Sequence, residues 1–445
     1  MIKLVFAWSI VAIALSADIV QANENAYAVV VSKETSADSE WSKVVDALVA
    51  KHDAKTIVYD GSVTESLDKL KGQFPRYACF VARPSEAGLK FVADVHQLTR
   101  QLDDDPYTDL RWGILTGYDA ENALTIAKHH APLVIEKSAA GTEIALDMCK
   151  EGIWYCELEQ NKFVKKEAGS GPKAEKGPSD TTQKLVELLN EYKPDLWVTS
   201  GHATERDWQI GFRYPNGQFR SKRGQLFGQD RQGQRFDVSS SNPKVYMPIG
   251  NCLMGHIDGP DAMALAYMKS AGVYQMLGYT APTWFGYGGW GVLDYFVEQP
   301  GRYTFNEAFF ANHHALIHAL QQDPKSRGLK FDRDVVAFYG DPAWEARMAV
   351  AGRAYEQTLT EDNGIYTFEI KLNRGADSFK PINTNGAQRG WRPIVQFLPQ
   401  RVKDVKIIDG DDLKPVITDD FILIPNPREA DLDRKYLVRF SAAKL

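Results

Sequence analysis

The segment Val245–Gly259, VYMPIGNCLMGHIDG, is an apolar run that ends in a glycine-flanked turn around one cysteine, Cys252. Its first half has the length and apolar content of a buried β-strand, and residues 259–272 beyond it have apolar residues at helical spacing. A strand that passes directly into a helix is the repeating unit of α/β proteins. The position of Cys252 leaves four roles open: a packing residue, half of a disulfide, a metal ligand with His256, or a nucleophile.

The same alternation continues along the chain on both sides of this segment. Short apolar runs bounded by turn residues predict strands, and longer runs with apolar residues three or four apart predict helices. The predicted strands are residues 25–32, 54–61, 76–84, 110–119, 194–202, 244–252, 273–281 and 334–344, and the predicted helices are residues 37–52, 63–74, 86–102, 120–131, 181–192, 259–272 and 304–322. This alternation predicts an α/β fold, a parallel sheet with helices on both faces.

Local composition divides the chain into parts. Residues 165–180 are rich in Lys, Gly, Pro and Ser and predict a flexible loop between an N-terminal α/β subdomain, residues 23–164, and a second, catalytic α/β subdomain, residues 181–354. Residues 355–445 contain short strand-like runs without a helical run, which predicts a small all-β, Ig-like sandwich domain. The polar stretch 214–238 contains Pro-Asn-Gly turn chemistry and predicts a hairpin or flap.

Residues 1–22 have the pattern of a secretory signal peptide, because Lys3 precedes an apolar stretch and small residues precede a predicted cleavage after Ala22. The apolar stretch is shorter than the ~20 residues of a spanning helix. We therefore expect a periplasmic or secreted protein with no membrane span after cleavage. The formal net charge of −6 over 445 residues provides no basic footprint, so we expect no nucleic-acid partner.

The chain has four cysteines, and an oxidising compartment would allow disulfides between them. Cys149 and Cys156 flank the segment KEGIWY and form one candidate pair. Cys79 lies in an apolar strand-like run and is interpreted as a buried core thiol, although a Cys79–Cys252 pair stays open. With the other three assigned in this way Cys252 is an unpaired thiol, which in an exported protein suggests reactivity.

Two predicted strand ends carry residues suited to catalysis. His202 and Cys252 each end a strand, and the two strands are consecutive in the second subdomain. Ligands of open parallel sheets bind beyond the carboxyl ends of the strands. An imidazole beside a thiol can accept its proton or stabilise the thiolate, and the sulfur can then attack a carbonyl carbon. The pattern predicts a Cys–His site in this crevice.

A strand that ends in His, followed by a strand that ends in Cys, resembles the caspase-like (clan CD) cysteine peptidases, and among them the gingipain family. The segments that carry the resemblance are WVTSGHATERDW (197–208), VYMPIGNCLMGHIDG (245–259), VYQMLGYTAPTW (273–284) and VVAFYGDPAW (335–344). The predicted signal peptide and terminal β-domain also fit this family. The resemblance is specific over about residues 195–345 and looser elsewhere.

The resemblance implies roles for single residues. His202 matches the family's catalytic histidine and Cys252 its nucleophile. The backbone N–H groups of Ala203 and Cys252 are the implied oxyanion donors. Thr283 and Trp284 match positions that line the pocket for the substrate side chain before the scissile bond.

The chain also departs from the family pattern. Ala203 stands where the family usually has glycine, and Asn251 stands where it usually has a small residue. The family's specificity residue has no clear match, and the acidic residues that could bind a basic substrate side chain are Glu151, Glu157 and Glu159.

Three other groups have metal-binding side chains. His256 and Asp258 lie close in sequence, but glycines around them interrupt a helix. His314 and His318 have the i, i+4 spacing of helical zinc ligands without the accompanying glutamate. Residues 103–109, DDDPYTD, offer carboxylates that suit Ca²⁺ but lack EF-hand spacing, so a structural Ca²⁺ stays open there.

These observations predict an exported cysteine endopeptidase that cleaves a protein or peptide substrate with a Cys–His dyad and needs no cofactor or catalytic metal. Two alternatives remain. The first is a catalytically degenerate, gingipain-like binding or scaffold protein of the cell envelope, which Ala203 and Asn251 suggest. The second is a metal-dependent hydrolase that uses His256 or the pair His314 and His318.

Overall fold

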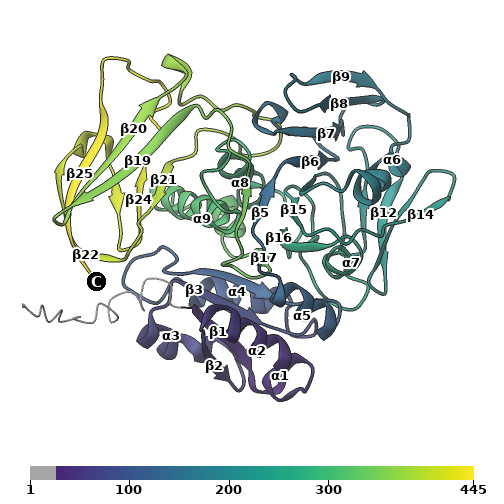
Figure 1. The fold of residues 1–445 in the computed structure, drawn as a ribbon, viewed down its shortest axis with the longest axis horizontal. Coiled ribbons are helices and arrows are strands. Elements are labelled where there is room, and N and C mark those ends of the chain that lie inside the picture. The colour runs from purple at the N-terminus through teal and green to yellow at the C-terminus, as the bar shows by residue number, and fades with distance from the viewer. Residues whose placement is uncertain (1–26) are drawn as a thin grey trace, which may run out of the picture.

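The computed structural model describes residues 27–445, so the predicted signal peptide lies outside the described residues. Its centre is a twelve-stranded sheet with the order β2-β1-β3-β4-β17-β16-β15-β10-β6-β7-β8-β9 (Figure 1). The strands are β1 (Tyr27–Ser32), β2 (Lys55–Tyr59), β3 (Tyr77–Val81), β4 (Arg111–Leu115), β6 (Lys137–Ala140), β7 (Glu151–Tyr155), β8 (Lys162–Lys166), β9 (Lys173–Lys176), β10 (Leu196–Thr199), β15 (Lys244–Pro248), β16 (Val273–Tyr279) and β17 (Val336–Tyr339).

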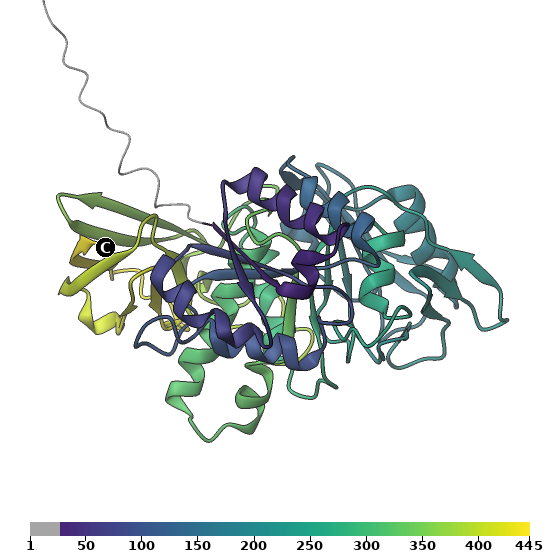
Figure 2. The same ribbon diagram turned by 90° about the horizontal axis from the view of Figure 1, so that it is seen from below.

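Helices lie on both faces of this sheet (Figure 2), which confirms the predicted α/β architecture. They are α1 (Lys33–Ala37), α2 (Trp41–His52), α3 (Leu67–Gln73), α4 (Leu89–Leu98), α5 (Ala120–Lys128), α6 (Thr182–Glu187), α7 (Met263–Ser270), α8 (Tyr287–Phe296), α9 (Phe305–Gln322) and α10 (Arg327–Asp332). The apolar faces of these helices and the strands between them form one continuous core. Burial of this apolar surface is the main force that holds the layers together.

The sheet is mixed rather than wholly parallel, which corrects the prediction. β2, β1, β3, β4 and β17 run parallel, and β16, β15, β10, β6 and β7 run parallel to one another, but β16 and β17 pair antiparallel. The reason is the connection through α8, α9 and α10, which returns the chain to the edge where β16 ended. The carboxyl ends of β10 and β15 still share one edge, as the Cys–His prediction requires.

The loop predicted over residues 165–180 is present only in part, because a strand interrupts it. This segment contains the end of β8 and all of β9, which pair antiparallel and extend the sheet beyond β7. Every residue of β9 is exposed, and its sequence KAEK places lysines on the edge strand, where they discourage pairing with other chains. The segment also does not divide the sheet, because β6, which precedes it, pairs with β10.

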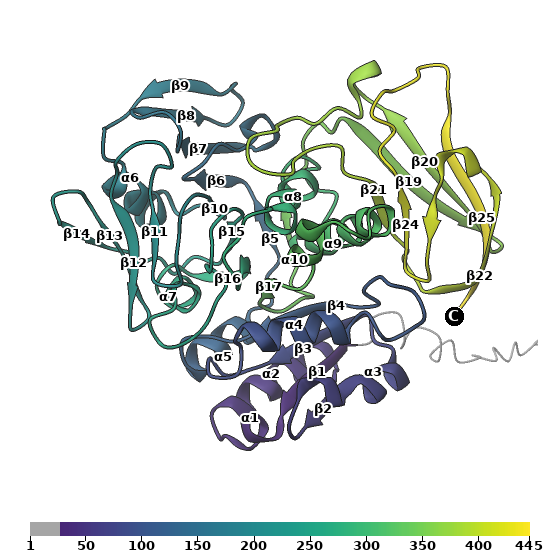
Figure 3. The ribbon, with the colours of Figure 1, turned by 180° about the vertical axis from the view of Figure 1, so that it is seen from behind.

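The polar stretch 214–238 forms antiparallel strands, as predicted. β11 (Asp207–Gln209), β12 (Gln218–Lys222), β13 (Gln225–Gln229) and β14 (Arg235–Asp237) make a small sheet beside α6 and α7 (Figure 3). Arg223 and Gly224 join β12 to β13, and both have positive φ, as a tight hairpin turn requires.

Residues 355–445 form two antiparallel sheets, as expected for a β-sandwich, at one end of the molecule (Figure 1). One sheet contains β19 (Tyr355–Asp362), β20 (Ile365–Leu372), β25 (Tyr436–Lys444) and β22 (Val402–Asp409), and the other contains β21 (Ile394–Phe397), β24 (Phe421–Ile424) and β23 (Val416–Ile417). The smaller sheet is buried on both faces. Ile394 and Ile422 face the sandwich core, whereas Val395 and Leu423 belong to the α/β core. The β-domain is therefore packed firmly onto the α/β body.

Candidate active site

The turns that follow β10 and β15 lie side by side. The two strands are parallel neighbours with Thr199 opposite Pro248, and the Ile249 N–H donates to the Thr199 carbonyl at 3.0 Å. His202 lies in the turn after β10, and Cys252 lies in the turn after β15. The structure thus places both residues at the same edge of the sheet.

Asn251 connects the two turns directly. Its side chain is fully buried, its Oδ1 accepts a hydrogen bond from the Thr199 hydroxyl at 2.6 Å, and its Nδ2 donates to the Gly201 carbonyl at 3.0 Å. Asn251, which precedes Cys252, is therefore hydrogen-bonded to Gly201, which precedes His202. Because this amide is buried and both its polar atoms are bonded, it neither crowds the exposed side of the two turns nor adds a donor there.

The Cys252 turn is tightly held and its thiol is half-buried. The thiol lies 3.5 Å from the Thr283 carbonyl oxygen. Leu253 has a φ of 56°, a left-handed conformation that costs a non-glycine residue about 1 kcal/mol. Gly255 donates to the Tyr279 carbonyl at 2.8 Å and lies so close to Gly278 that a Cβ at residue 255 would overlap that backbone. The turn is thus pinned against β16.

The His202 ring is exposed, and its centroid lies 4.8 Å from that of Phe212, which is also exposed. The residue in this turn that needs positive φ is Gly201, with a φ of 96°. Ala203 lacks positive φ and forms a β-bridge with Trp208. The alanine at this position therefore carries no backbone strain.

The residues with predicted binding roles lie around this edge. Within residues 27–445, the backbone N–H groups of Ala203 and Cys252 have no hydrogen-bond partner, so both are free to donate to a ligand. Thr283 contacts the Cys252 thiol through its carbonyl, and the next residue, Trp284, is 62% exposed. The Trp284 ring packs edge-on against Phe285 and at a tilt against Phe331, and much of its aromatic surface stays exposed.

Glu157 is buried behind the His202 turn. Its carboxylate accepts hydrogen bonds from the Thr142 hydroxyl at 2.8 Å and from the Ser200 hydroxyl, and burial raises its pKa above the usual value. Sequence reasoning named it only as one of three acidic candidates for substrate binding. The other two lie elsewhere: Glu151 accepts from the Tyr192 hydroxyl, and Glu159 pairs with Lys162 at the surface.

All four cysteines are free in the described residues, so the proposed Cys149–Cys156 disulfide is wrong. The two residues flank β7, and an extended strand of this length separates its ends by roughly 17 Å or more, far beyond the ~7 Å limit between disulfide-bonded Cα atoms. Cys79 is fully buried in β3, where burial raises the pKa of its thiol, in agreement with a core role.

The structure does not support the metal-dependent alternative. Among residues 27–445, neither His256 nor the pair His314 and His318 belongs to a group of three or more metal-ligating side chains. Asp258 forms an ion pair with Arg206 at 2.6 Å. His314 is buried and stacks on Phe421 of the β-domain, with ring centroids 4.3 Å apart, and burial lowers its pKa to about 4.

The acidic segment 103–109 does bring carboxylates together. Single oxygens of Asp103, Asp105 and Asp109 lie within 4.8 Å of one another. Burial and the neighbouring charges raise the pKa of Asp109 to about 9 and that of Asp105 to about 6. Hard oxygen donors of this kind suit Ca²⁺, although backbone N–H groups already occupy one oxygen of each carboxylate.

Comparison with known proteins gives little beyond this geometry. No family model matches the chain, and no curated protein matches its sequence. A solved structure with a similar fold is the complex of Porphyromonas gingivalis RgpB pro- and mature domains, with 13% identity, a TM-score of 0.49, and coverage of 94% of this chain and 100% of that chain. RgpB is a gingipain, the family that the sequence segments resemble. Likeness at this level adds no argument about activity.

Proposed function

We propose that this protein is a cysteine-type endopeptidase in which Cys252 is the nucleophile and His202 the proton-transfer group. The observation that supports the proposal most strongly is the placement of both residues on adjoining turns, joined by the buried Asn251 amide. A half-buried thiol and an exposed imidazole on adjoining turns, with two backbone N–H groups that have no partner among the described residues, supply the groups that acyl transfer requires.

The proposed reaction has two halves. The Cys252 sulfur, as thiolate, attacks the carbonyl carbon of the scissile peptide bond, and the oxyanion accepts hydrogen bonds from the N–H groups of Ala203 and Cys252. Collapse of the intermediate breaks the C–N bond, and protonated His202 gives its proton to the leaving amine. Water, deprotonated by neutral His202, then attacks the thioester, which releases the carboxylic acid and returns the thiol.

The exposed aromatic surface of Trp284 and Phe212 belongs to the same proposal. These side chains flank Cys252 and His202, and exposed large aromatic side chains beside a site are suited to contact substrate. Thr283 and Trp284 are therefore the proposed lining of the pocket for the residue before the scissile bond. No catalytic metal or organic cofactor takes part in the proposed chemistry.

The test is cleavage of a mixed fluorogenic peptide library by the mature protein under reducing conditions. We expect Cys252→Ala to abolish cleavage and His202→Ala to reduce it by about 10²-fold or more, as for loss of a general acid. Cys156→Ala is a matched control, because that cysteine is buried and lies outside the Cys252 turn. Cleavage that survives Cys252→Ala contradicts the proposal. A wild-type protein with no cleavage and an inert Cys252 thiol would favour the scaffold alternative.

We also propose that the protein is exported, as the first 22 residues predict. No helix among the described residues is long and apolar enough to cross a membrane. Expression of the full chain followed by N-terminal sequencing of the periplasmic or secreted fraction tests this proposal. A mature protein that begins at Asn23 supports it, and an intact Met1 in the cytoplasm contradicts it.

A further inference from the structure

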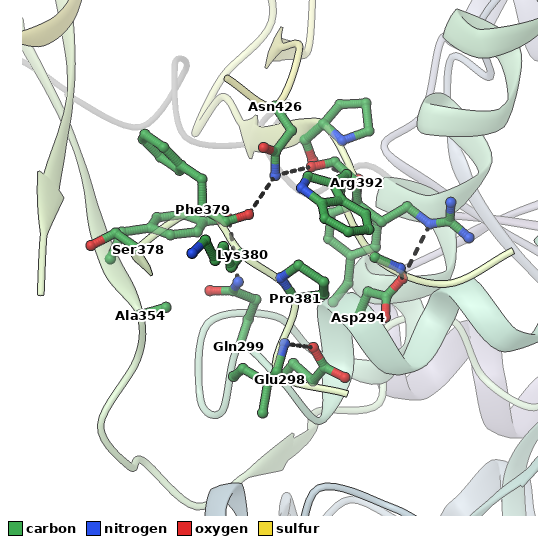
Figure 4. Close-up of a pocket in the computed structure, with 16 residues that line it drawn as sticks. Asp294, Glu298, Gln299, Ala354, Ser378, Phe379, Lys380, Pro381, Arg392 and Asn426 are labelled. Carbon is green, nitrogen blue, oxygen red and sulfur yellow. Dashed lines mark hydrogen bonds and ion pairs between the residues drawn. The ribbon is translucent and has the colours of Figure 1, made fainter. Parts of the chain in front are cut away.

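A loop of the β-domain crosses onto the α/β body next to the candidate active site. Residues 378–393, called the strap below, connect a short 3₁₀ turn, Gly375–Asp377, to β21 and contact α8 (Figure 4). Its ends are held within the β-domain, where the Asn426 amide donates to the Phe379 and Arg392 carbonyls at 3.3 Å each. The middle of the strap therefore lies against α8.

Two buried carboxylates at α8 hold the strap. Arg389 donates to Asp294 at 2.6 Å and also to Glu298, and all three side chains are almost fully buried. The backbone N–H groups of Gly390 and Ile382 donate to the same two carboxylates at 3.0 and 3.2 Å (Figure 4). Buried charged groups paired in this way fix geometry closely, because movement of either partner leaves a charge unpaired.

Trp290 of α8 lies between the strap and the Cys252 turn. A Cβ added to Gly250 would lie 2.6 Å from the Trp290 Nε1, and a Cβ added to Gly386 of the strap would overlap the Trp290 ring. The indole therefore fills the space between two glycine backbones, one of them two positions before Cys252. Its 7% exposure shows that no solvent layer separates these surfaces.

The strap also approaches the His202 side of the site. The Asn383 amide donates to the Glu143 carboxylate at 3.3 Å. Glu143 follows Thr142, whose hydroxyl donates to Glu157, and Glu157 in turn accepts from Ser200 in the turn that carries His202. One loop is thus linked to both turns of the candidate site, through Trp290 on one side and through Glu143 and Glu157 on the other.

We propose that the strap of the β-domain sets the position of the Cys252 turn through Trp290. A second, indirect link runs from Asn383 through Glu143 and Glu157 to the His202 turn. Trp290 and Asn383 are positioning residues, since neither is placed at the reacting atoms. The inference rests on the proposed function for its effect on catalysis, but its structural part concerns only the Cys252 turn. The β-domain accordingly supports the candidate site through packing and contributes no catalytic side chain.

The test uses the full mature chain and two readouts. The first is the rate of alkylation of Cys252 by iodoacetamide across pH, followed by mass spectrometry of the peptide that contains Cys252, with the three buried cysteines as internal references. The second is kcat and KM for peptide cleavage. The variants are Trp290→Phe, Trp290→Ala and Asn383→Ala. The matched control is Trp391→Ala, because Trp391 is an exposed strap residue that contacts Arg428 of the β-domain.

We expect Trp290→Phe to change the Cys252 alkylation rate severalfold and shift its pH profile, with Trp391→Ala unchanged. For cleavage, we expect kcat to fall by about 10-fold or more at nearly constant KM in Trp290→Phe and Asn383→Ala, as displacement of a catalytic group by less than 1 Å can do. Each variant is first checked for cooperative unfolding. If Trp290→Ala does not fold, the proposal is tested with Trp290→Phe and Asn383→Ala alone. Alkylation profiles of Trp290→Phe that match the wild type overturn the proposal. A wild type that cleaves no peptide defeats the proposed function but leaves the alkylation test intact.

Discussion

Replacement of Asn251 by alanine removes a side chain that joins the His202 and Cys252 turns directly. The substitution deletes two hydrogen bonds, one from the Thr199 hydroxyl and one to the Gly201 carbonyl. The Thr199 hydroxyl keeps a partner in Tyr246 at 2.9 Å, so only the Gly201 carbonyl is left without its donor. Loss of the Thr199 bond costs about 1 kcal/mol, and loss of the Gly201 bond, which leaves a partly buried carbonyl unpaired, costs about 1–3 kcal/mol. We therefore expect a loss of about 2–4 kcal/mol in the free energy of unfolding.

The measurement combines urea unfolding with the peptide-cleavage assay. Asn306→Ala is the matched control, because Asn306 is equally buried and its amide donates to the Trp112 carbonyl at 3.1 Å, between α9 and β4. Both variants should lose stability, but only Asn251→Ala should lose cleavage activity, because only this residue sets the spacing of the two turns. The reasoning is refuted if Asn251→Ala retains wild-type kcat, or if its unfolding free energy falls by less than about 0.5 kcal/mol.

Three further predictions concern buried titratable groups. Burial lowers the pKa of His96 and His314 to about 4, so each histidine binds a proton more readily in the unfolded chain than in the folded one. The free energy of unfolding should therefore fall by up to about 1.4 kcal/mol per pH unit for each histidine as the pH drops from about 6.5 to 4. In denaturant titrations at several pH values, His314→Phe should make this slope shallower. Because the pKa of Asp109 is raised to about 9, stability should fall as pH rises from about 4 to 9, and Asp109→Asn should raise the melting temperature at pH 8 but not at pH 4. If Asp103, Asp105 and Asp109 hold Ca²⁺, added CaCl₂ should raise the wild-type melting temperature at pH 8 and leave that of Asp109→Asn unchanged, and equal responses of the two proteins would contradict a site there.

The fold and the two strand ends were predictable because they depend on local pattern. Apolar runs of strand length alternate with helical spacing along the chain, and His202 and Cys252 each end such a run. The antiparallel junction between β16 and β17 was not predictable in this way, since it depends on where the connection through α8, α9 and α10 re-enters the sheet. The proposed Cys149–Cys156 disulfide was wrong for a related reason. The number of residues between the two cysteines does not fix the distance between them in space, which depends on β7 being extended.

The surroundings of the site were harder to predict, because they depend on contacts between distant segments. Trp290 is one of several aromatic residues in a glycine-rich stretch, and nothing near it in the sequence indicates that Gly250 and Gly386 enclose its ring. Glu157 was named for a different role, and its contact with Ser200 exists only because β7 and β10 flank β6. The β-domain contains no His or Cys, so its sequence gives no sign of a role near the site, and the strap is linked to the site through packing and hydrogen bonds alone.

The structure also explains the two departures from the family pattern, Ala203 and Asn251. A glycine is required in the His202 turn only where φ is positive, and that position is Gly201, so Ala203 fits without strain and keeps its N–H free. The Asn251 amide is buried and donates to the opposite turn. Neither residue therefore argues for a degenerate site. The two positions that suggested a scaffold protein leave the backbone N–H groups of Ala203 and Cys252 without a partner among the described residues. The choice between enzyme and scaffold therefore depends on the reactivity of Cys252 itself.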